Sequence, residues 1–212
     1  LNNSFLIINF SSNIILSSIL IAFPLINLLI SLLDFSNLDK ITRSIMVICL
    51  SSSSSLIFIV GKLEVSKIGS SKTTDVGIVH RPGFSDQTNF AGTAAIKILD
   101  FFEDYYGINY PGSKLDLIAI PDFAMGAMEN VGAVTFRETL LLIEVEKATR
   151  AELSRSVEVI AHELAHMWFG DLVTMNWWDG IWLNEAFASL MEVIASEATY
   201  PEFKLWNQMN LD

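Results

Sequence analysis

The sequence lacks the residues that build several common kinds of site. It has one cysteine, Cys49, in 212 residues, which excludes an internal disulfide framework and a CxxC pair and leaves the redox compartment open. Its 13 lysines and arginines are outnumbered by 24 aspartates and glutamates, for a formal net charge of −11. Proteins that bind nucleic acid present a basic face, so we expect no nucleic-acid partner. Histidine is scarce too, at three residues in the whole chain.

Charged residues are almost absent from the first 60 positions, which hold only Asp34, Asp39, Lys40 and Arg43. Residues 14–33 form an uncharged run of about the length that a bilayer core requires. Its serines, its proline and the lack of basic residues before it are atypical of membrane segments and signal peptides. A membrane segment therefore stays the less favoured alternative to buried strands. We expect residues 1–55 to form a short, ill-defined apolar region that ends in a low-complexity serine run.

Residues 56–212 have the mixed patterning of an α+β domain. Strands are predicted at 55–60, 75–81, 115–120 and 132–143 from apolar and β-branched runs. A helix is predicted after a cap at Ser85 or Asp86, and Gly107 ends it. Two further helices are predicted at 146–169 and 183–198 from apolar spacing.

Two of the three histidines lie one helical turn apart in the segment AHELAHMWFGD, at His162 and His166. Residues four apart project from nearly the same side of a helix, so both imidazoles can reach one ion. Zinc accepts such nitrogens and takes three protein ligands plus a water in catalytic sites. Glu163 is rotated by about 100° from His162, which suits a general base beside the metal rather than a ligand. The alternative is a pair of helical histidines that face solvent or core.

A third ligand is expected on another element. Glu185, in WLNEAF on the following predicted helix, would complete a His2Glu set, which is known in catalytic zinc sites. A solvated glutamate near a helix start is the alternative. The largely apolar surroundings favour the ligand, because a carboxylate among apolar residues needs a partner.

The spacing of HELAH and Glu185, together with GAMEN at residues 126–130 and FGDLVTMNWWDGIWLNEAF, resembles the aminopeptidase N family of zinc metallopeptidases. The resemblance covers roughly residues 56–212. It implies a thermolysin-like zinc metallopeptidase catalytic domain, preceded in the family by an all-β domain. Residues 1–50 show no convincing likeness to that β domain, so residues 1–55 stay open between a remnant of it and a membrane segment. It also implies that His162, His166 and Glu185 bind one Zn²⁺, that Glu163 is the base, and that Glu129 holds the free amine of a peptide substrate.

GAMEN also fits such a substrate chemically, because a carboxylate in a partly dry pocket pairs strongly with an α-amine. The substrate-binding residues are then expected to be Glu129, Gly126, Ala127, Met128 and Asn130. Gly126 lets backbone approach the peptide, and the neighbouring amides and carbonyls can pair with it as an added strand. Met125 is predicted to line the pocket for the first substrate side chain. On its own, GAMEN would be an ordinary turn before a strand.

The family places an oxyanion-stabilising tyrosine well downstream of the third ligand, whereas this sequence ends 27 residues after Glu185. We therefore expect a catalytic domain truncated at its C-terminal end. Two functions follow: a zinc aminopeptidase that hydrolyses the N-terminal peptide bond, or a catalytically incomplete fragment that binds zinc and peptide. A cytoplasmic location is favoured, with membrane association as the alternative.

The remaining histidine and the tryptophans are expected to be structural. His80, beside Arg81 and Pro82, is predicted at the surface or in a loop, and not as a ligand. Four tryptophans are predicted to form core around the zinc-binding helices: Trp168, Trp177, Trp178 and Trp182.

Overall fold

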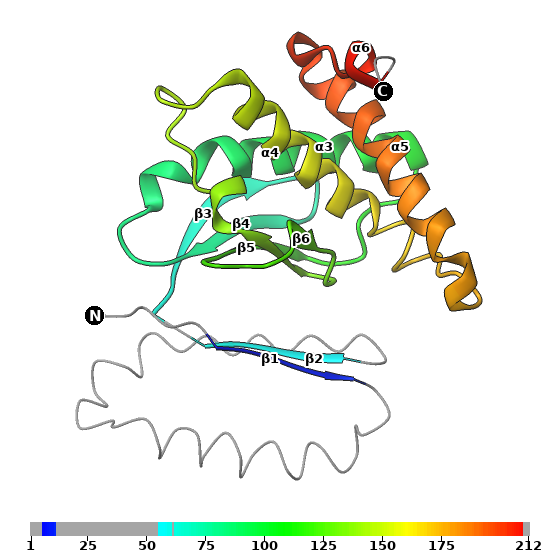
Figure 1. Cartoon of the computed structure of the whole chain (residues 1–212), viewed down its shortest axis with the longest axis horizontal. Coiled ribbons are helices and arrows are strands. Elements are labelled where there is room, and N and C mark those ends of the chain that lie inside the picture. The colour runs from blue at the N-terminus through cyan, green and yellow to red at the C-terminus, as the bar shows by residue number, and fades with distance from the viewer. Residues whose placement is uncertain (1–5, 12–54, 61, 210–212) are drawn as a thin grey trace. The chain divides into compact units, whose positions relative to one another are not determined.

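A computed structural model describes residues 6–11, 55–60 and 62–209 (Figure 1). The chain divides into two compact units, residues 1–64 and 65–212. In the first unit, β1 (Leu6–Ser11) pairs antiparallel with β2 (Ser55–Val60), which confirms the strand predicted at 55–60. The apolar run at 14–33 lies outside the described residues. Among the helices of the described part, none is long and apolar enough to cross a bilayer. The predicted domain limits, 1–55 and 56–212, remain a prediction.

The second unit is built on a five-stranded sheet in the order β3-β4-β5-β7-β6. Its strands are β3 (Glu64–Ser70), β4 (Asp75–His80), β5 (Lys114–Ile120), β6 (Ala127–Met128) and β7 (Ala133–Arg137). β5 lies parallel to both β4 and β7, while β6 pairs antiparallel with β7 at one edge. β5 is buried at six consecutive positions, as expected for an apolar strand in the parallel part of a sheet.

The helices of this unit are α3 (Asn89–Tyr106), α4 (Arg150–Ala165), α5 (Ile181–Thr199) and the short α6 (Leu205–Met209). Figure 1 shows α3 and α4 over one face of the sheet, with α5 crossing beside them. Side chains of α3, α4 and the central strands form one continuous core, which includes Ile98, Phe102, Leu117 and Ile160. The predicted α+β class is confirmed.

Two helices begin at other residues than predicted. Ser85 and Asp86 do not cap α3 but lie in a short 3-10 helix, Ser85–Gln87, and Thr88 occupies the N-cap position. The start of α4 is set by a capping box, in which the Thr149 side chain and Glu152 satisfy each other's backbone amides. That pair leaves residues 146–148 outside the helix. Gly107 ends α3 as predicted, with a left-handed φ of 63°.

The strand predicted at 132–143 is correct only in its first part. β7 ends at Arg137, and the chain continues as a 3-10 helix, Glu138–Leu140. The apolar residues beyond it, including Leu141, pack against the core. A short apolar run of this kind does not distinguish a strand from another buried segment. The predicted strand therefore extended past the observed end of β7.

The prediction that His80 lies at the surface or in a loop was wrong. The residue lies on β4 and is fully buried. Its Nδ1 donates to the carbonyl of Arg81 at 2.8 Å, so Nε2 accepts from the hydroxyl of Ser66, also at 2.8 Å. A histidine whose two nitrogens are both satisfied can be buried at little cost.

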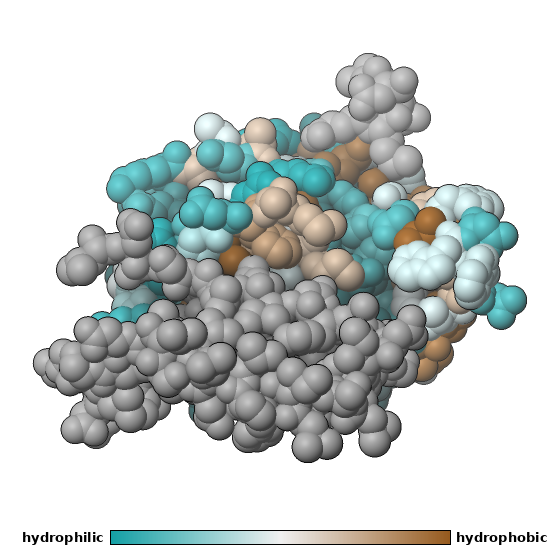
Figure 2. Space-filling model, turned by 60° about the horizontal axis from the view of Figure 1, so that its bottom comes forward, coloured by the Kyte–Doolittle hydropathy of each residue, from teal (hydrophilic) through white to brown (hydrophobic). Residues whose placement is uncertain are grey.

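The tryptophan prediction holds for Trp168, which is 3% exposed, and is wrong for the other three. Trp177, Trp178 and Trp182 are 67–70% exposed. They lie in the 3-10 segment Trp178–Gly180 and its flanks, ahead of the first buried residue of α5, Ala188. In Figure 2, pale and brown side chains gather at the right-hand edge, on the side where α5 begins in Figure 1. Among the described residues, this end of α5 extends past the core, and these three tryptophans stay exposed.

Candidate metal centre and peptide pocket

The two histidines of HELAH lie at the C-terminal end of α4. His162 is in its last turn, and His166 is the C-cap residue. Their Nε2 atoms point toward each other and lie 3.1 Å apart. His166 is 1% exposed. Gly170 lies against its ring: a Cβ there would come within 3.3 Å of Nδ1, and its φ is 141°. A side chain at position 170 would therefore be strained and would crowd the imidazole.

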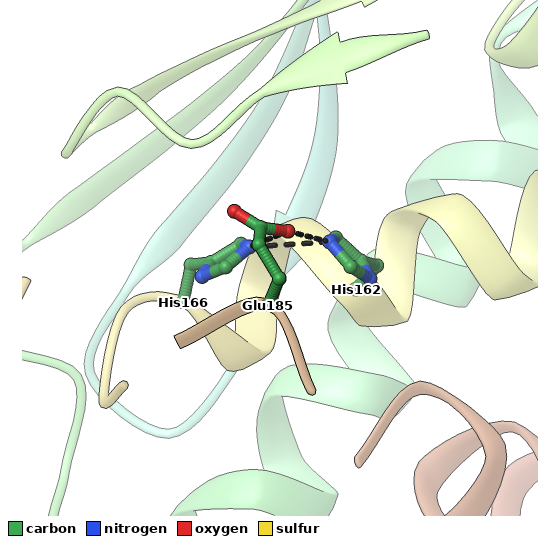
Figure 3. Close-up of side chains that lie close together, drawn as sticks. All are labelled: His162, His166 and Glu185. Carbon is green, nitrogen blue, oxygen red and sulfur yellow. Dashed lines mark hydrogen bonds and ion pairs between the residues drawn. The ribbon is translucent and has the colours of Figure 1, made fainter. Parts of the chain in front are cut away.

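Glu185 reaches the same point from the first turns of α5 (Figure 3). Its Oε2 lies 3.3 Å from Nε2 of His162 and 3.6 Å from Nε2 of His166. Zinc bonds of about 2.0–2.1 Å in a tetrahedral arrangement place ligand atoms about 3.3–3.4 Å apart. The three atoms therefore have the spacing that such an ion requires, and the chain has a possible His/Glu metal site here.

The hydrogen bonds on the far side of each ring determine which nitrogen carries the proton. Nδ1 of His166 lies 3.0 Å from the carbonyl oxygen of Phe169, and Nδ1 of His162 lies 3.0 Å from a carboxylate oxygen of Glu192. Both oxygens are acceptors, so each Nδ1 donates. In the neutral rings both Nε2 atoms then present lone pairs to each other and to Glu185. A cation between them satisfies all three acceptors.

The side chains of His162, His166 and Glu185 form one wall of a pocket of about 430 Å³. The pocket is lined by nine of the ten residues that the sequence singled out: Met125, Gly126, Ala127, Met128, Glu129, His162, Glu163, His166 and Glu185. Asn130 does not line it. The side-chain amide of Asn130 instead donates to the carbonyl of Met128 and the hydroxyl of Thr135, and so holds the turn between β6 and β7.

Strand β6, which contributes Ala127 and Met128, pairs with β7 along one side only and is the last strand of the sheet. The carbonyl of Gly126 accepts from the backbone of Arg137 at 2.8 Å, which anchors the strand. Such an edge strand has backbone groups available for pairing with an extended peptide.

Glu163 is 6% exposed, and its Oε2 has no hydrogen-bond partner among the described residues. Burial raises the pKa of this carboxyl to about 8, and the charge of Glu129 adds to the effect, while His162 opposes it. Asp171 shows the same pattern: burial, and then the charge of Glu129, raises its pKa to about 7. In and beside the pocket, carboxyl groups are therefore gathered in a partly dry place where burial disfavours their charge, and a nearby cation would favour their ionised form.

Arg155, Val159, Ser189 and Glu192 also line the pocket, and the sequence analysis did not single them out. The clearest signal was available in α5. Ser189 and Glu192 follow Glu185 by four and seven residues, which places them on one face of the helix. Burial lowers the pKa of His162, but the hydrogen bond and charge of Glu192, together with the charges of Glu163 and Glu185, raise it overall.

Comparison with known proteins supports a peptidase. The model of the "Peptidase family M1 domain" matches residues 90–212. Human endoplasmic reticulum aminopeptidase 2 is 56% identical over 129 residues, which is 61% of this chain and 13% of that protein. Aminopeptidase M1 of Arabidopsis thaliana is 45% identical over 150 residues, covering 71% of this chain and 17% of that protein.

A third relative, the puromycin-sensitive aminopeptidase of Caenorhabditis elegans, is 45% identical over 149 residues, covering 70% of this chain and 16% of that protein. The chain thus spans less than a fifth of the length of each of these three relatives.

Proposed function

The chain belongs to the peptidase family M1, and from that membership and the geometry of the pocket we propose that it is the site-bearing part of a zinc aminopeptidase. The observation that carries the proposal is the convergence of His162, His166 and Glu185 within 3.1–3.6 Å of one another, in a pocket that also holds Glu129 and Glu163. The substrate would be a peptide with a free N-terminus, and we further propose a thermolysin-like catalytic domain.

His162, His166 and Glu185 would hold one zinc ion, since their chemistry is that of a His2Glu set. When bound, zinc polarises a carbonyl and lowers the pKa of a coordinated water toward neutrality. The same positive charge favours the ionised form of neighbouring carboxyls. Glu163, whose pKa is high in the metal-free pocket, would then be ionised and ready to accept a proton.

The chain's own residues would transfer the proton and bind the substrate. Glu163 accepts the proton of the attacking water at its carboxylate and delivers it to the leaving amine. Glu129 pairs with the α-ammonium of the substrate and so fixes which peptide bond meets the base. The backbone of Ala127 and Met128 binds the peptide as an added strand at the sheet edge. Met125, which is 59% exposed and lines the same pocket, would contact the first substrate side chain.

Zinc content and peptide turnover of the purified chain test this function. We expect about one zinc per chain and release of the N-terminal residue from free peptides but not from acetylated ones. Glu163→Gln should keep the zinc and lose turnover, because an amide does not accept the proton. Glu129→Ala should lose the preference for a free N-terminus, with Glu129→Gln as the isosteric control.

A wild-type chain that binds no zinc would contradict the metal site. Zinc binding without turnover of any peptide would instead favour the alternative, a fragment that binds zinc and peptide only. Glu129→Ala with equal losses on free and acetylated peptides would make Glu129 a structural residue of the turn.

A further inference from the structure

We propose that Glu192 is the positioning residue for His162: it fixes the tautomer and the ring orientation that aim Nε2 at the metal centre. The inference rests on the proposed zinc site and concerns a residue that has no direct place in the reaction. It is carried by the contacts of Glu192 on two sides, with His162 and with Arg155.

The first contact is the 3.0 Å hydrogen bond from Nδ1 of His162 to Oε2 of Glu192. The two side chains are only 20% and 15% exposed, so water competes weakly for the bond. Because the carboxylate only accepts, it holds the proton on Nδ1 and leaves the lone pair on Nε2. Acceptors of this kind behind a ligating imidazole orient the ring and raise its basicity.

The second contact engages the other carboxylate oxygen. Nη1 of Arg155 lies 3.5 Å from Oε1 of Glu192 and 3.4 Å from Oε2 of Glu158. Arg155 is 60% exposed, so this ion pair is expected to be weak. Its effect is to bias the Glu192 carboxylate toward the histidine rather than to hold it rigidly.

The two histidines differ in what lies behind them. His166 donates to the backbone carbonyl of Phe169 at 3.0 Å, and no side-chain substitution removes that acceptor. His162 depends on a side chain from another helix. Since Glu192 follows Glu185 by two helical turns on one face of α5, the same face would supply a ligand and orient a second one.

The rival explanation is that Glu192 only links α4 to α5 through Arg155. Arg155→Ala breaks that link without removing the carboxylate behind His162, and so it is the matched control. Glu158 is a second control for the loss of a carboxylate: it pairs with the same arginine from within α4, is 18% exposed where Glu192 is 15%, and has no hydrogen bond to either histidine among the described residues. If Glu192 were only a helix link, Arg155→Ala, which breaks the same link, and Glu192→Ala should behave alike.

The test has two measurements. Zinc affinity is measured by competition with a chromophoric chelator, with zinc alone as the probe. The imidazole tautomers of the metal-free chain are measured by ¹⁵N NMR. With three histidines in the chain, the signals can be assigned by substitution. We expect Glu192→Ala to weaken zinc binding about 10- to 100-fold and to release His162 from the Nδ1–H tautomer.

Glu192→Gln keeps an acceptor oxygen without the charge, so it should lie between wild type and Glu192→Ala, and it serves if the alanine variant does not fold. Glu158→Ala should stay within about twofold of wild type, and Arg155→Ala should cost about fivefold at most. Unchanged affinity and tautomer in both Glu192 variants would overturn the inference. A wild-type chain that fails to bind zinc would contradict the proposed function instead, and the tautomer measurement would still decide the role of Glu192.

Discussion

The two helices that meet at the candidate metal centre are anchored very differently. α4 buries nine of its 16 residues and begins with a complete capping box. α5 is longer, at 19 residues, yet buries only four, and its N-cap residue, Gly180, makes no side-chain cap bond. The helix that supplies both histidines is therefore held by the core along its length. The helix that supplies Glu185 is held mainly by its C-terminal half.

This difference bears on how the site would form. His166 is buried beside the core, whereas the side chain of Glu185 is 51% exposed and precedes the first buried residue of its helix, Ala188. The histidines are positioned by folding. The carboxylate has more freedom, and a bound cation would hold it at the histidines and so join the exposed end of α5 to α4. We expect the substitutions below to separate these two kinds of anchoring.

The largest expected effect is the pH dependence that Glu163 gives the metal-free chain. Its pKa is raised by burial from 4.5 to about 8, so the folded state favours the protonated form. The resulting stability is present below about pH 4.5 and is lost as pH rises through about 8. At 1.36 kcal/mol per pKa unit, the loss is on the order of 5 kcal/mol.

Glu163→Gln cannot ionise, so with a chelator present its unfolding free energy should lack this part of the decline, while the part from Asp171, whose pKa burial raises to about 7, remains. Urea denaturation across the pH range measures it. Glu146→Gln, at an exposed carboxylate whose charge does not act on Glu163, is the control and should follow the wild-type profile. If Glu163→Gln declines with pH as wild type does, burial of this carboxyl is not what makes the fold pH-sensitive.

A pair of truncations compares the helices directly. Ile160 on α4 is fully buried, while Trp182 on α5 is 67% exposed. Ile160→Ala should cost about 2–5 kcal/mol of unfolding free energy through lost burial and a cavity. Trp182→Ala removes a larger side chain but should stay within about 0.5 kcal/mol. Chemical denaturation of both variants checks this, and a large loss at Trp182 would mean that this end of α5 is anchored after all.

The same contrast explains what the sequence could predict of the fold. Strands such as β5 and helices such as α4 carry their period in the sequence, and both were predicted. Whether an apolar residue is covered depends on tertiary neighbours, so the exposure of Trp177 was missed. β3 (Glu64–Ser70), with mostly polar residues, carries no strong strand signal and was also missed.

For the site, residue spacing predicted which side chains of one helix lie together, but it did not predict contacts between two helices. A separation of four residues placed His162 and His166 together, and the family motif pointed to Glu185. Glu192 shares a face of α5 with Glu185, but its pairing with His162 comes from a crossing of α4 with α5 that no local pattern encodes. The burial of His80 depends likewise on Ser66, on the neighbouring strand.

Removing a ligand from the firmly held helix should have the next effect. His166→Ala should lower zinc affinity by more than about 100-fold, since loss of an outer partner already costs about 10- to 100-fold. The substitution should also lower stability without metal, because His166 is buried and bonded to the backbone of Phe169. Glu185→Ala should lower zinc affinity while leaving the metal-free stability nearly unchanged. Chelator competition measures the zinc affinity of each variant, and thermal unfolding with and without zinc measures its stability. Equal losses of metal-free stability in His166→Ala and Glu185→Ala would contradict the proposed difference in anchoring.

The smallest expected effect concerns how α4 begins. Thr149 accepts from the backbone of Glu152, and Glu152 accepts from the backbone of Thr149 at 2.7 Å. Thr149→Ala breaks the first of these bonds and should cost about 0.5–2 kcal/mol of unfolding free energy. Thr149→Ser keeps the hydroxyl and is the control, expected near wild type. The histidines lie more than three turns away at the other end of the helix, so zinc affinity should not change. A parallel fall in zinc affinity would show that the start of α4, and not only its buried C-terminal half, holds the histidines in place.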